Sequence, residues 1–547
     1  MKSNYLSELQ TRRKFFRQAA CAAVGTVAMN SVLRDLRFIN SAVAQTNITD
    51  YRALICVFLN GGNDANNMVI FTDSADYPSY AATRTSALAL PNVDGSTATI
   101  QQLFVPGSGN TTKYSDAAGH TYGMHPAMSR PNVSSAKSVI DLFNSGNMAL
   151  LLNAGTLSYP ITKAQYLSGS VPQPPQLYSH SDQQTQWQTS IPDQPPTSGW
   201  GGRIADLMTA AQVNGNSPAI SMAVTLAGSN IFEVGTNNLS PEYSISTSGA
   251  VNLSGTVTGN SAKNTVFNNI LNSEAGFNDL QMKTYAGVAE SAITTAASLT
   301  STLNTIGTPT YLSNNFPGFN GGNVTITIPN TNLASTYSSS LMGQMAMVCK
   351  MIDAGKNFLG MKRQIFFIQV GGYDTHTNQN LLTQTGNSTS AFGTLVTNNL
   401  ILGQQANLLA ELSQALGAFY AAMGDMGTLR GDGAAAMQKK AVAFTVSDFA
   451  RTFPSNGSGS DHGWGSHHMI VGGDVVGGKT YGAMPVLAVN GPSDTGTGRW
   501  IPTTAVDQYA ATLASWYGVD SAHLSSVFPN LGRFASSNLG FLPIYPS

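Results

Sequence analysis

Apolar residues along the chain fall into short continuous runs, and segments with helical spacing lie between them. The runs at 52–59 ("RALICVFL"), 148–154 ("MALLLNA"), 363–370 ("RQIFFIQV") and 440–446 are a few residues long and almost wholly apolar. Such runs are typical of strands that are buried on both faces of a sheet. We therefore predict buried strands at these four positions.

Segments with apolar residues three and four positions apart precede these strands. They predict helices over 338–356, before strand 363–370, and over 402–426, before strand 440–446. The other predicted elements are helices over 134–145, up to Trp187 and over 201–212, and a strand near 219–226. Because helices alternate with apolar strands, we expect an α/β fold with a doubly wound, largely parallel sheet and helices on both faces.

Two long polar stretches interrupt this alternation. Residues 72–120 lack a clear periodicity, and residues 235–335 are rich in Ser, Thr, Asn and Gly. We interpret both as insertions into a single α/β domain that covers 45–547, because this length suits one large domain with insertions.

The first 44 residues have the pattern of a targeting segment. Arg12 and Arg13 stand before two phenylalanines, a short apolar run follows, and "AVAQ" offers a small-residue cleavage site after Ala44. This order resembles a twin-arginine export signal. A basic amphipathic surface helix is the alternative, but it does not explain the cleavage site. We expect the twin-arginine translocase to be a partner during export, and the mature chain to be periplasmic or secreted.

Composition narrows the classes of partner. Only 10% of the residues are charged and no basic patch stands out, which argues against nucleic-acid binding. The apolar run in the signal is short for a transmembrane helix, and no later run approaches about 18 apolar residues. We expect a mature chain without stable membrane insertion.

Carboxylates follow three of the most apolar strands. Asp64 ends "LNGGND", Asp374 ends "QVGGYD" and Asp448 ends "TVSD". Each could be a helix cap or a turn residue. In parallel α/β sheets, however, the ligand site lies outside the carboxyl ends of the strands, so we expect the three side chains to share one site.

A cation would stabilise such a cluster, because neighbouring carboxylates repel and raise each other's pKa. A divalent ion is therefore expected, and the residue types suit Zn, Mn, Mg or Ca. His376 in "DTH", and Asp461 with His462 in "DHGWGSHH", are further candidate ligands. His467 and His468 are equally compatible with a ligand role and a structural role, whereas we expect His120 and His523 to be structural.

Several motifs together carry a family resemblance. In chain order they are "VFLNGGNDANNMV", "GMHPAM", "YSHSDQQTQW", "FIQVGGYDTHTNQ", "SDFARTFPSNGSGSDHGWG" and "VVGGKTYG". Behind a twin-arginine signal, this series resembles the exported bacterial family catalogued as domain of unknown function 1501. That family in turn resembles the alkaline phosphatase and sulfatase superfamily, whose strands deliver metal-binding Asp and His residues to one edge.

The resemblance assigns roles by position. It implies an alkaline phosphatase-like fold in which Asp64, Asp374, His376, Asp448 and His462 match the metal ligands of the superfamily. Two departures stand out: Phe449 replaces a ligand histidine, and Asp374 lies closer to His376 than is usual. Both put a complete two-metal site in doubt.

The resemblance also places "SHSDQQTQW" where a nucleophile would begin a helix, whose N-terminal amides would hold an oxyanion. Ser179 and Ser181 are the candidates, with His180 between them as ligand or base. A simple helix cap explains the motif equally well. Arg451 could bind an anionic ester or form a structural salt bridge.

These observations predict an exported metal-dependent hydrolase of phosphate or sulfate esters, acting on a small or polymeric anionic ester. The alternative is a catalytically degenerate protein that binds metal or a polymer in envelope or extracellular assembly. Phe449 and the large neutral insertion favour the alternative.

Overall fold

The structure is a computed structural model, and it describes most of the chain after residue 47. The described residues are 48–92, 99–129, 133, 136–251, 262–263, 265–266, 269, 273, 280–327, 336–380, 388–389, 395–397, 400–401 and 403–545. The predicted export signal, 1–44, and parts of the predicted insertion at 235–335 lie outside them. The prediction of one domain with two insertions therefore stays a prediction.

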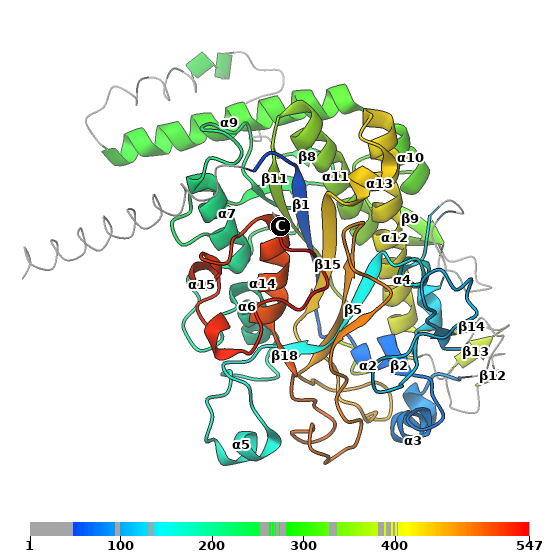
Figure 1. The fold of residues 1–547 in the computed structure, drawn as a ribbon. Coiled ribbons are helices and arrows are strands. Elements are labelled where there is room, and N and C mark those ends of the chain that lie inside the picture. The colour runs from blue at the N-terminus through cyan, green and yellow to red at the C-terminus, as the bar shows by residue number, and fades with distance from the viewer. Residues whose placement is uncertain are drawn as a thin grey trace, which may run out of the picture.

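A ten-stranded mixed sheet forms the centre of the molecule (Figure 1). Its middle strand is β1 (Arg52–Leu59), which pairs in parallel with β11 (Arg363–Val370) on one side and with β15 (Ala441–Ser447) on the other. The strand order is β17-β5-β16-β15-β1-β11-β6-β7-β8, and β18 also pairs with β5. The outer strands are β5 (Met148–Gly155), β6 (Ala223–Thr225), β7 (Tyr243–Ser246), β8 (Gly249–Ala250), β16 (Ser466–Val471), β17 (Thr480–Gly482) and β18 (Thr504–Ala505).

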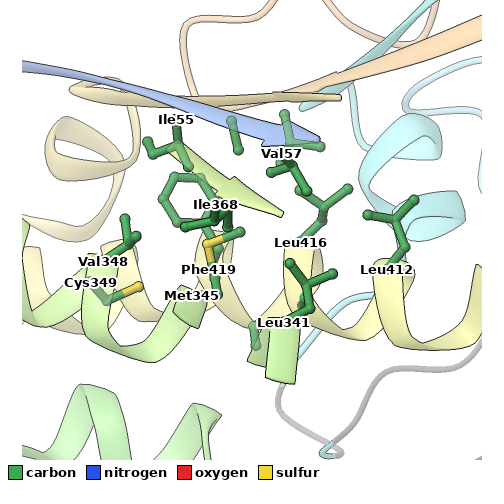
Figure 2. Close-up of a cluster of buried hydrophobic side chains, with 14 of the residues drawn as sticks. Ile55, Val57, Leu341, Met345, Val348, Cys349, Ile368, Leu412, Leu416 and Phe419 are labelled. Atoms are coloured by element: carbon green, nitrogen blue, oxygen red, sulfur yellow. The ribbon is translucent and has the colours of Figure 1, made fainter. Parts of the chain in front are cut away.

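One face of the sheet packs against two long helices. These are α11 (Ser340–Asp353) and α12 (Gln404–Arg430), and their apolar stripes meet Ile55 and Val57 of β1 (Figure 2). The stripe of α12 includes Leu412, Leu416 and Phe419, which lie directly beneath the strands in this view. The predicted helical spacing is therefore the spacing of the core contacts on this face.

The alternate residues of β1 point to the opposite face. Leu54, Cys56 and Phe58 lie in a second core cluster with α7 (Trp200–Ala210) and α14 (Val506–Tyr517). Figure 1 shows α7 and α14 on one side of the sheet and α11 and α12 on the other. The strands are thus buried on both faces, which confirms the α/β prediction with helices on both sides.

The sheet is mostly parallel, but it has antiparallel pairs at its β8 edge, where β7 pairs with β8, and around one inner strand. Strand β16 runs antiparallel to both β15 and β5. The sequence did not predict this strand, because its first residues, "SHH", look polar although all three are buried.

The remaining elements surround these layers. The helices and 3₁₀ or π turns are α2 (Ala65–Met68), α3 (Tyr77–Leu88), η1 (Pro126–Met128), α4 (Val139–Asn144), α5 (Lys163–Ser168), α6 (His180–Thr189), α9 (Leu280–Ile306), α10 (Thr310–Asn315), η2 (Ala354–Phe358), α13 (Ala434–Gln438), α15 (Leu524–Val527) and η3 (Leu531–Arg533). The small sheets contain β2 (Val69–Phe71), β3 (Gln101–Gln102), β4 (Tyr122–Met124), β9 (Val324–Thr327), β10 (Thr336–Ser339), β12 (Ser388–Thr389), β13 (Leu395–Thr397) and β14 (Leu400–Ile401). In the part of the chain that the structure describes, no helix has the length and apolar character needed to cross a membrane.

Candidate metal centre

The loops after β15, β1 and β11 meet because these three strands are neighbours in the sheet. Gly61, in the loop after β1, touches both of the others: its N–H lies 3.2–3.3 Å from the carboxylate oxygens of Asp448, and a Cβ on it would stand 2.4 Å from the backbone nitrogen of Asp374. Its φ of 114° is also one that favours glycine. Gly61 is therefore required by the close approach of the three loops.

His180 is the first residue of α6 and points its imidazole at two of these loops. Its Nδ1 lies 2.6 Å from Oδ2 of Asp448, a carboxylate that is fully buried and also accepts a hydrogen bond from Gln184 Nε2 at 2.9 Å. The hydrogen bond to Asp448 raises the pKa of His180. Its Nε2 is buried, makes no hydrogen bond within the described residues, and lies 3.6 Å from Oδ2 of Asp374.

His462 approaches Asp374 from the other side. Its Nδ1 donates to the backbone oxygen of Tyr178 at 2.8 Å, since a carbonyl can only accept, and its Nε2 lies 3.4 Å from Oδ1 of Asp374. Burial lowers the pKa of His462. Phe449, which is fully buried, packs against the rings of both His180 and His462 at centroid distances of 4.8 and 4.6 Å. Phe449 therefore holds the two rings in place.

His376 completes a group of three imidazoles around Asp374. Its Nδ1 lies 3.0 Å from Oδ1 of Asp461, and its Nε2 lies 3.1 Å from Oδ1 of Asp374. Burial raises the pKa of Asp461, but hydrogen bonds from Asn456 and His376 outweigh it, and the pKa is lowered overall.

The contact between His376 and His462 needs a positive charge. Their Nε2 atoms are 2.9 Å apart. If both rings are neutral and donate through Nδ1, two lone pairs face each other at that distance. Only a proton or a metal cation between them turns this contact into an attraction.

Asp374 is held by Arg451. The Nη1 of Arg451 donates to Oδ1 of Asp374 at 2.7 Å and to the backbone oxygen of Gly61 at 3.2 Å, and Nη2 donates to the backbone oxygen of Ser460. Burial raises the pKa of Asp374, but this guanidinium lowers it on balance, so the carboxylate stays ionised. Because Arg451 is wholly buried and bonded through both terminal nitrogens, it acts here as a structural partner of Asp374.

Asp64 lies in a buried polar network. Its Oδ2 accepts hydrogen bonds from Nη2 of Arg84 and Nε2 of Gln379. Arg84 in turn donates to the backbone oxygens of Thr452 and Phe453, at 3.1 and 2.9 Å. The structure therefore places Asp64 in an ion pair that joins the loops after β1 and β15, and does not bring its carboxylate into the group around Asp374.

The two candidate nucleophiles face another acid. The hydroxyl of Ser179 donates to Oδ2 of Asp182 at 2.6 Å, and that of Ser181 lies 3.4 Å from the same oxygen. Neither hydroxyl bonds to His180 or Asp448 among the contacts of the described residues. This arrangement is that of the start of a helix.

The remaining histidines of the predicted motifs lie in the core. His467 Nδ1 accepts the backbone N–H of Asn153 at 2.9 Å, and His468 packs between Trp187 and Tyr509. Burial lowers the pKa of both imidazoles to about 3, so both are neutral. His523 pairs with Asp520 at 2.7 Å.

The geometry selects one set of possible ligands from the predicted residues. Nitrogens of His180 and His462 and an oxygen of Asp374 all lie within 4.8 Å of one another. Two imidazoles and a carboxylate are a donor set that suits zinc, manganese or iron better than the all-oxygen sites of calcium. The buried Nε2 of His180, which makes no hydrogen bond in the described part of the chain, fits a coordinating role.

Five of the residues predicted as metal ligands lie in one segment of the chain. Residues 356–497 match the family described as "Protein of unknown function (DUF1501)". This match supports the family resemblance inferred from the motifs. The DUF1501 segment contains Asp374, His376, Asp448, Asp461 and His462, whereas Asp64 and His180 come from outside it. No curated protein matches the chain.

Sequence reasoning missed the residues that orient the histidines. Asp448 was predicted as a ligand, but it bonds to Nδ1 of His180, the nitrogen that faces away from Asp374. Tyr178, which contributes its carbonyl to His462, was not singled out. Its backbone has a φ of 74°, unusual for a residue other than glycine, and such conformations occur at functional sites. No feature of the sequence signals this conformation.

Proposed function

We propose that the chain is an exported metal-dependent hydrolase of phosphate or sulfate esters, with one divalent transition-metal ion at His180, Asp374 and His462. The observation that carries this proposal is the arrangement of the imidazoles. Each has its Nδ1 tied to a carboxylate or carbonyl and its Nε2 directed at Asp374. Second partners of this kind fix ring orientation and ligand basicity in metal sites.

A bound ion of this class supplies a Lewis acid and lowers the pKa of a water that it holds to roughly 7. The chain's own residues would then position the reactants. Asp448 holds His180 and the carbonyl of Tyr178 holds His462, while Phe449 keeps water from the backs of both rings. His376 is 42% exposed and is paired with Asp461, so it is placed to hold a proton and to deliver it to a leaving oxygen.

A second candidate is a metal-binding protein without turnover. The short distance between the Nε2 atoms of His376 and His462 favours it, because a fourth protein ligand would close the site, as in structural zinc centres. Arg451 is bonded to Asp374 and so does not present its guanidinium to an anionic ester, which also favours this candidate.

The variant His376→Ala separates the two candidates. In the hydrolase, we expect metal content to stay at the wild-type level while turnover of aryl phosphates or sulfates is lost. In the binding protein, we expect the variant to lose metal and the wild type to show no turnover. A wild type without stoichiometric zinc, manganese or iron after purification would refute both.

The fold relation to alkaline phosphatases and sulfatases and the export route are part of this proposal. The first rests on the order of the motifs, with Phe449 and the short Asp374–His376 spacing as departures. The second rests on the twin-arginine pattern. Lys substitutions at Arg12 and Arg13 should retain the precursor in the cytoplasm, and normal export of that variant would refute the route.

A further inference from the structure

Arg499 is anchored beside the three histidines by two contacts. It lies in the loop between β17 and β18, and its Nε donates to the backbone oxygen of His462 at 2.8 Å. The carbon of its guanidinium lies 4.5 Å from the centroid of the Tyr178 ring. Both neighbours belong to the metal centre described above, because the carbonyl of Tyr178 holds Nδ1 of His462.

The two terminal nitrogens of Arg499 are not used by these contacts. In the described parts of the chain, neither makes a hydrogen bond or an ion pair with a protein group. Asp494, the nearest acid in the same loop, is turned to the backbone, where it accepts from the N–H groups of Asn490, Gly496 and Arg499 at 2.7–2.9 Å. The guanidinium therefore has one edge of two N–H₂ groups that no protein group in the described parts of the chain occupies.

Arg451 is the contrasting case. It is fully buried. Its Nη1 donates hydrogen bonds to Asp374 and Gly61, and its Nη2 donates to Ser460. Arg499 is only half-buried. Of the two arginines around His462, only Arg499 presents a free edge.

We infer that Arg499 forms an anion-binding site at the rim of the metal centre, and that this site takes a tetrahedral oxyanion such as the phosphate or sulfate group of an ester. A planar guanidinium binds two oxygens of such a group through parallel N–H···O bonds. Stacking on Tyr178 and the bond to His462 fix its orientation before the ligand arrives, which reduces the entropy lost on binding. The choice of oxyanion rests on the proposed function; the binding edge does not.

The experiment measures the affinity of purified mature protein for inorganic phosphate and, separately, inorganic sulfate by calorimetry. It is done on metal-loaded and on chelator-treated protein, and metal content is measured in each sample. We expect Arg499→Gln to weaken binding of at least one of the two anions about tenfold or more, as loss of a charge-assisted pair does. Arg499→Lys, which keeps the charge but loses the two-pronged edge, should fall between.

Arg533→Gln is the matched control. Arg533 also stacks on a tyrosine, Tyr159 at 4.4 Å, but its Nη1 is paired with Asp193 at 2.6 Å. We expect this variant to bind the anions as the wild type does. Equal affinities in wild type and both Arg499 variants would overturn the inference, and so would a wild type that binds neither anion. A wild type without metal would refute the proposed function, whereas the affinity difference at Arg499 would still decide the anion site.

Discussion

Among the residues that the structure describes, two groups of histidine and aspartate side chains bring three possible ligand atoms within 4.8 Å of one another. One is His180 with Asp374 and His462, and the other is Asp73 with Asp76 and His120. In the first group, Nδ1 of each histidine is bonded to a residue outside the group. In the second, Nδ1 of His120 is itself the atom that meets the acids, at 2.7 Å from Asp76 and 3.8 Å from Asp73.

Asp73 of the second group also accepts hydrogen bonds from the backbone. Oδ1 of Asp73 accepts the backbone N–H groups of Ala75 and Asp76, at 3.1 and 2.9 Å, at the start of α3. His120 therefore contacts two acids that lie next to a helix start. Proximity of Asp and His alone therefore does not distinguish the two groups. The stronger criterion is which nitrogen the surrounding structure leaves available.

The largest expected effect tests directly whether the two groups differ in metal binding. His180→Ala removes a proposed ligand, and we expect the affinity for zinc or manganese to fall by roughly 100-fold or more, because loss of an outer partner alone costs 10–100-fold. His120→Ala, the matched change in the second group, should leave metal content unchanged. Elemental analysis and metal titration decide the outcome, with far-UV circular dichroism as the test of folding. Equal metal loss in both variants would contradict the distinction.

Asp448→Asn tests the outer partner itself. The carboxylate accepts from His180, Gln184 and Gly61, and an amide would place N–H groups where only acceptors fit. We expect metal affinity to fall about 10–100-fold. Asp182→Asn is the control, since Asp182 lies on the same helix but bonds only the hydroxyls of Ser179 and Ser181 among the contacts described above. Wild-type affinity in Asp448→Asn would mean that His180 needs no such support.

The sequence predicted much of the fold, because the apolar pattern of each segment indicates which of its residues are buried. Strands β1, β11 and β15 are apolar runs, and the stripes of α11 and α12 follow from helical spacing. Strand β16 was missed because His467 and His468 look polar, and only the surrounding core shows that they are buried and neutral. The predicted helix 338–356 ends at Asp353 and continues as the π turn η2, a change of hydrogen bonding that residue spacing does not report.

The site was predictable only in part. Asp374 and His462 could be found because strand ends and Asp-His pairs are visible in the sequence. The role of Asp448, however, depends on which nitrogen of His180 it meets, and the two residues are 268 positions apart. The partnership of Asp64 with Arg84 also required a fold, since nothing near "NGGND" signals a buried arginine. Sequence therefore indicates the residue types of a site more readily than their division into ligands and supports.

A smaller effect is expected from the hydrogen bonds that connect Asp64 to the candidate metal centre. Gln379 connects Asp64 to the loop of Asp461, because its Nε2 donates to Asp64 and its Oε1 accepts the hydroxyl of Ser460 at 2.7 Å. We expect Gln379→Ala to lower the free energy of unfolding by about 1–3 kcal/mol, as loss of buried hydrogen-bond partners does. Metal affinity should fall less than tenfold. Denaturant titration of metal-free protein and metal titration measure the two quantities.

Gln438→Ala is the control for Gln379. Its Nε2 bonds to the backbone oxygen of Tyr420 at 3.2 Å, on α12. We expect its metal affinity to equal that of the wild type. If Gln379→Ala also keeps wild-type affinity while losing stability, Asp64 and its partners support only the fold.

The smallest effect concerns a histidine that resembles those of the site in sequence but not in surroundings. His468 is buried between Trp187 and Tyr509, and neither ring nitrogen has a hydrogen-bond partner in the described structure. Burial, with a contribution from His467, lowers its pKa from 6.5 to about 3. Below about pH 6.5 this histidine therefore binds a proton in the unfolded chain but not in the folded chain. The free energy of unfolding then falls as the pH drops toward 3, by at most about 1.36 kcal/mol per pH unit for this group.

In His468→Phe, we expect stability at pH 7 to be unchanged within about 1 kcal/mol or raised, and its decline between pH 6 and 4 to be shallower. Melting temperatures of chelator-treated protein measure this, because metal loss then contributes to neither variant. If the melting temperature of His468→Phe declines equally steeply, the buried imidazole of β16 takes up its proton without unfolding. Burial alone would then not separate structural histidines from those around Asp374.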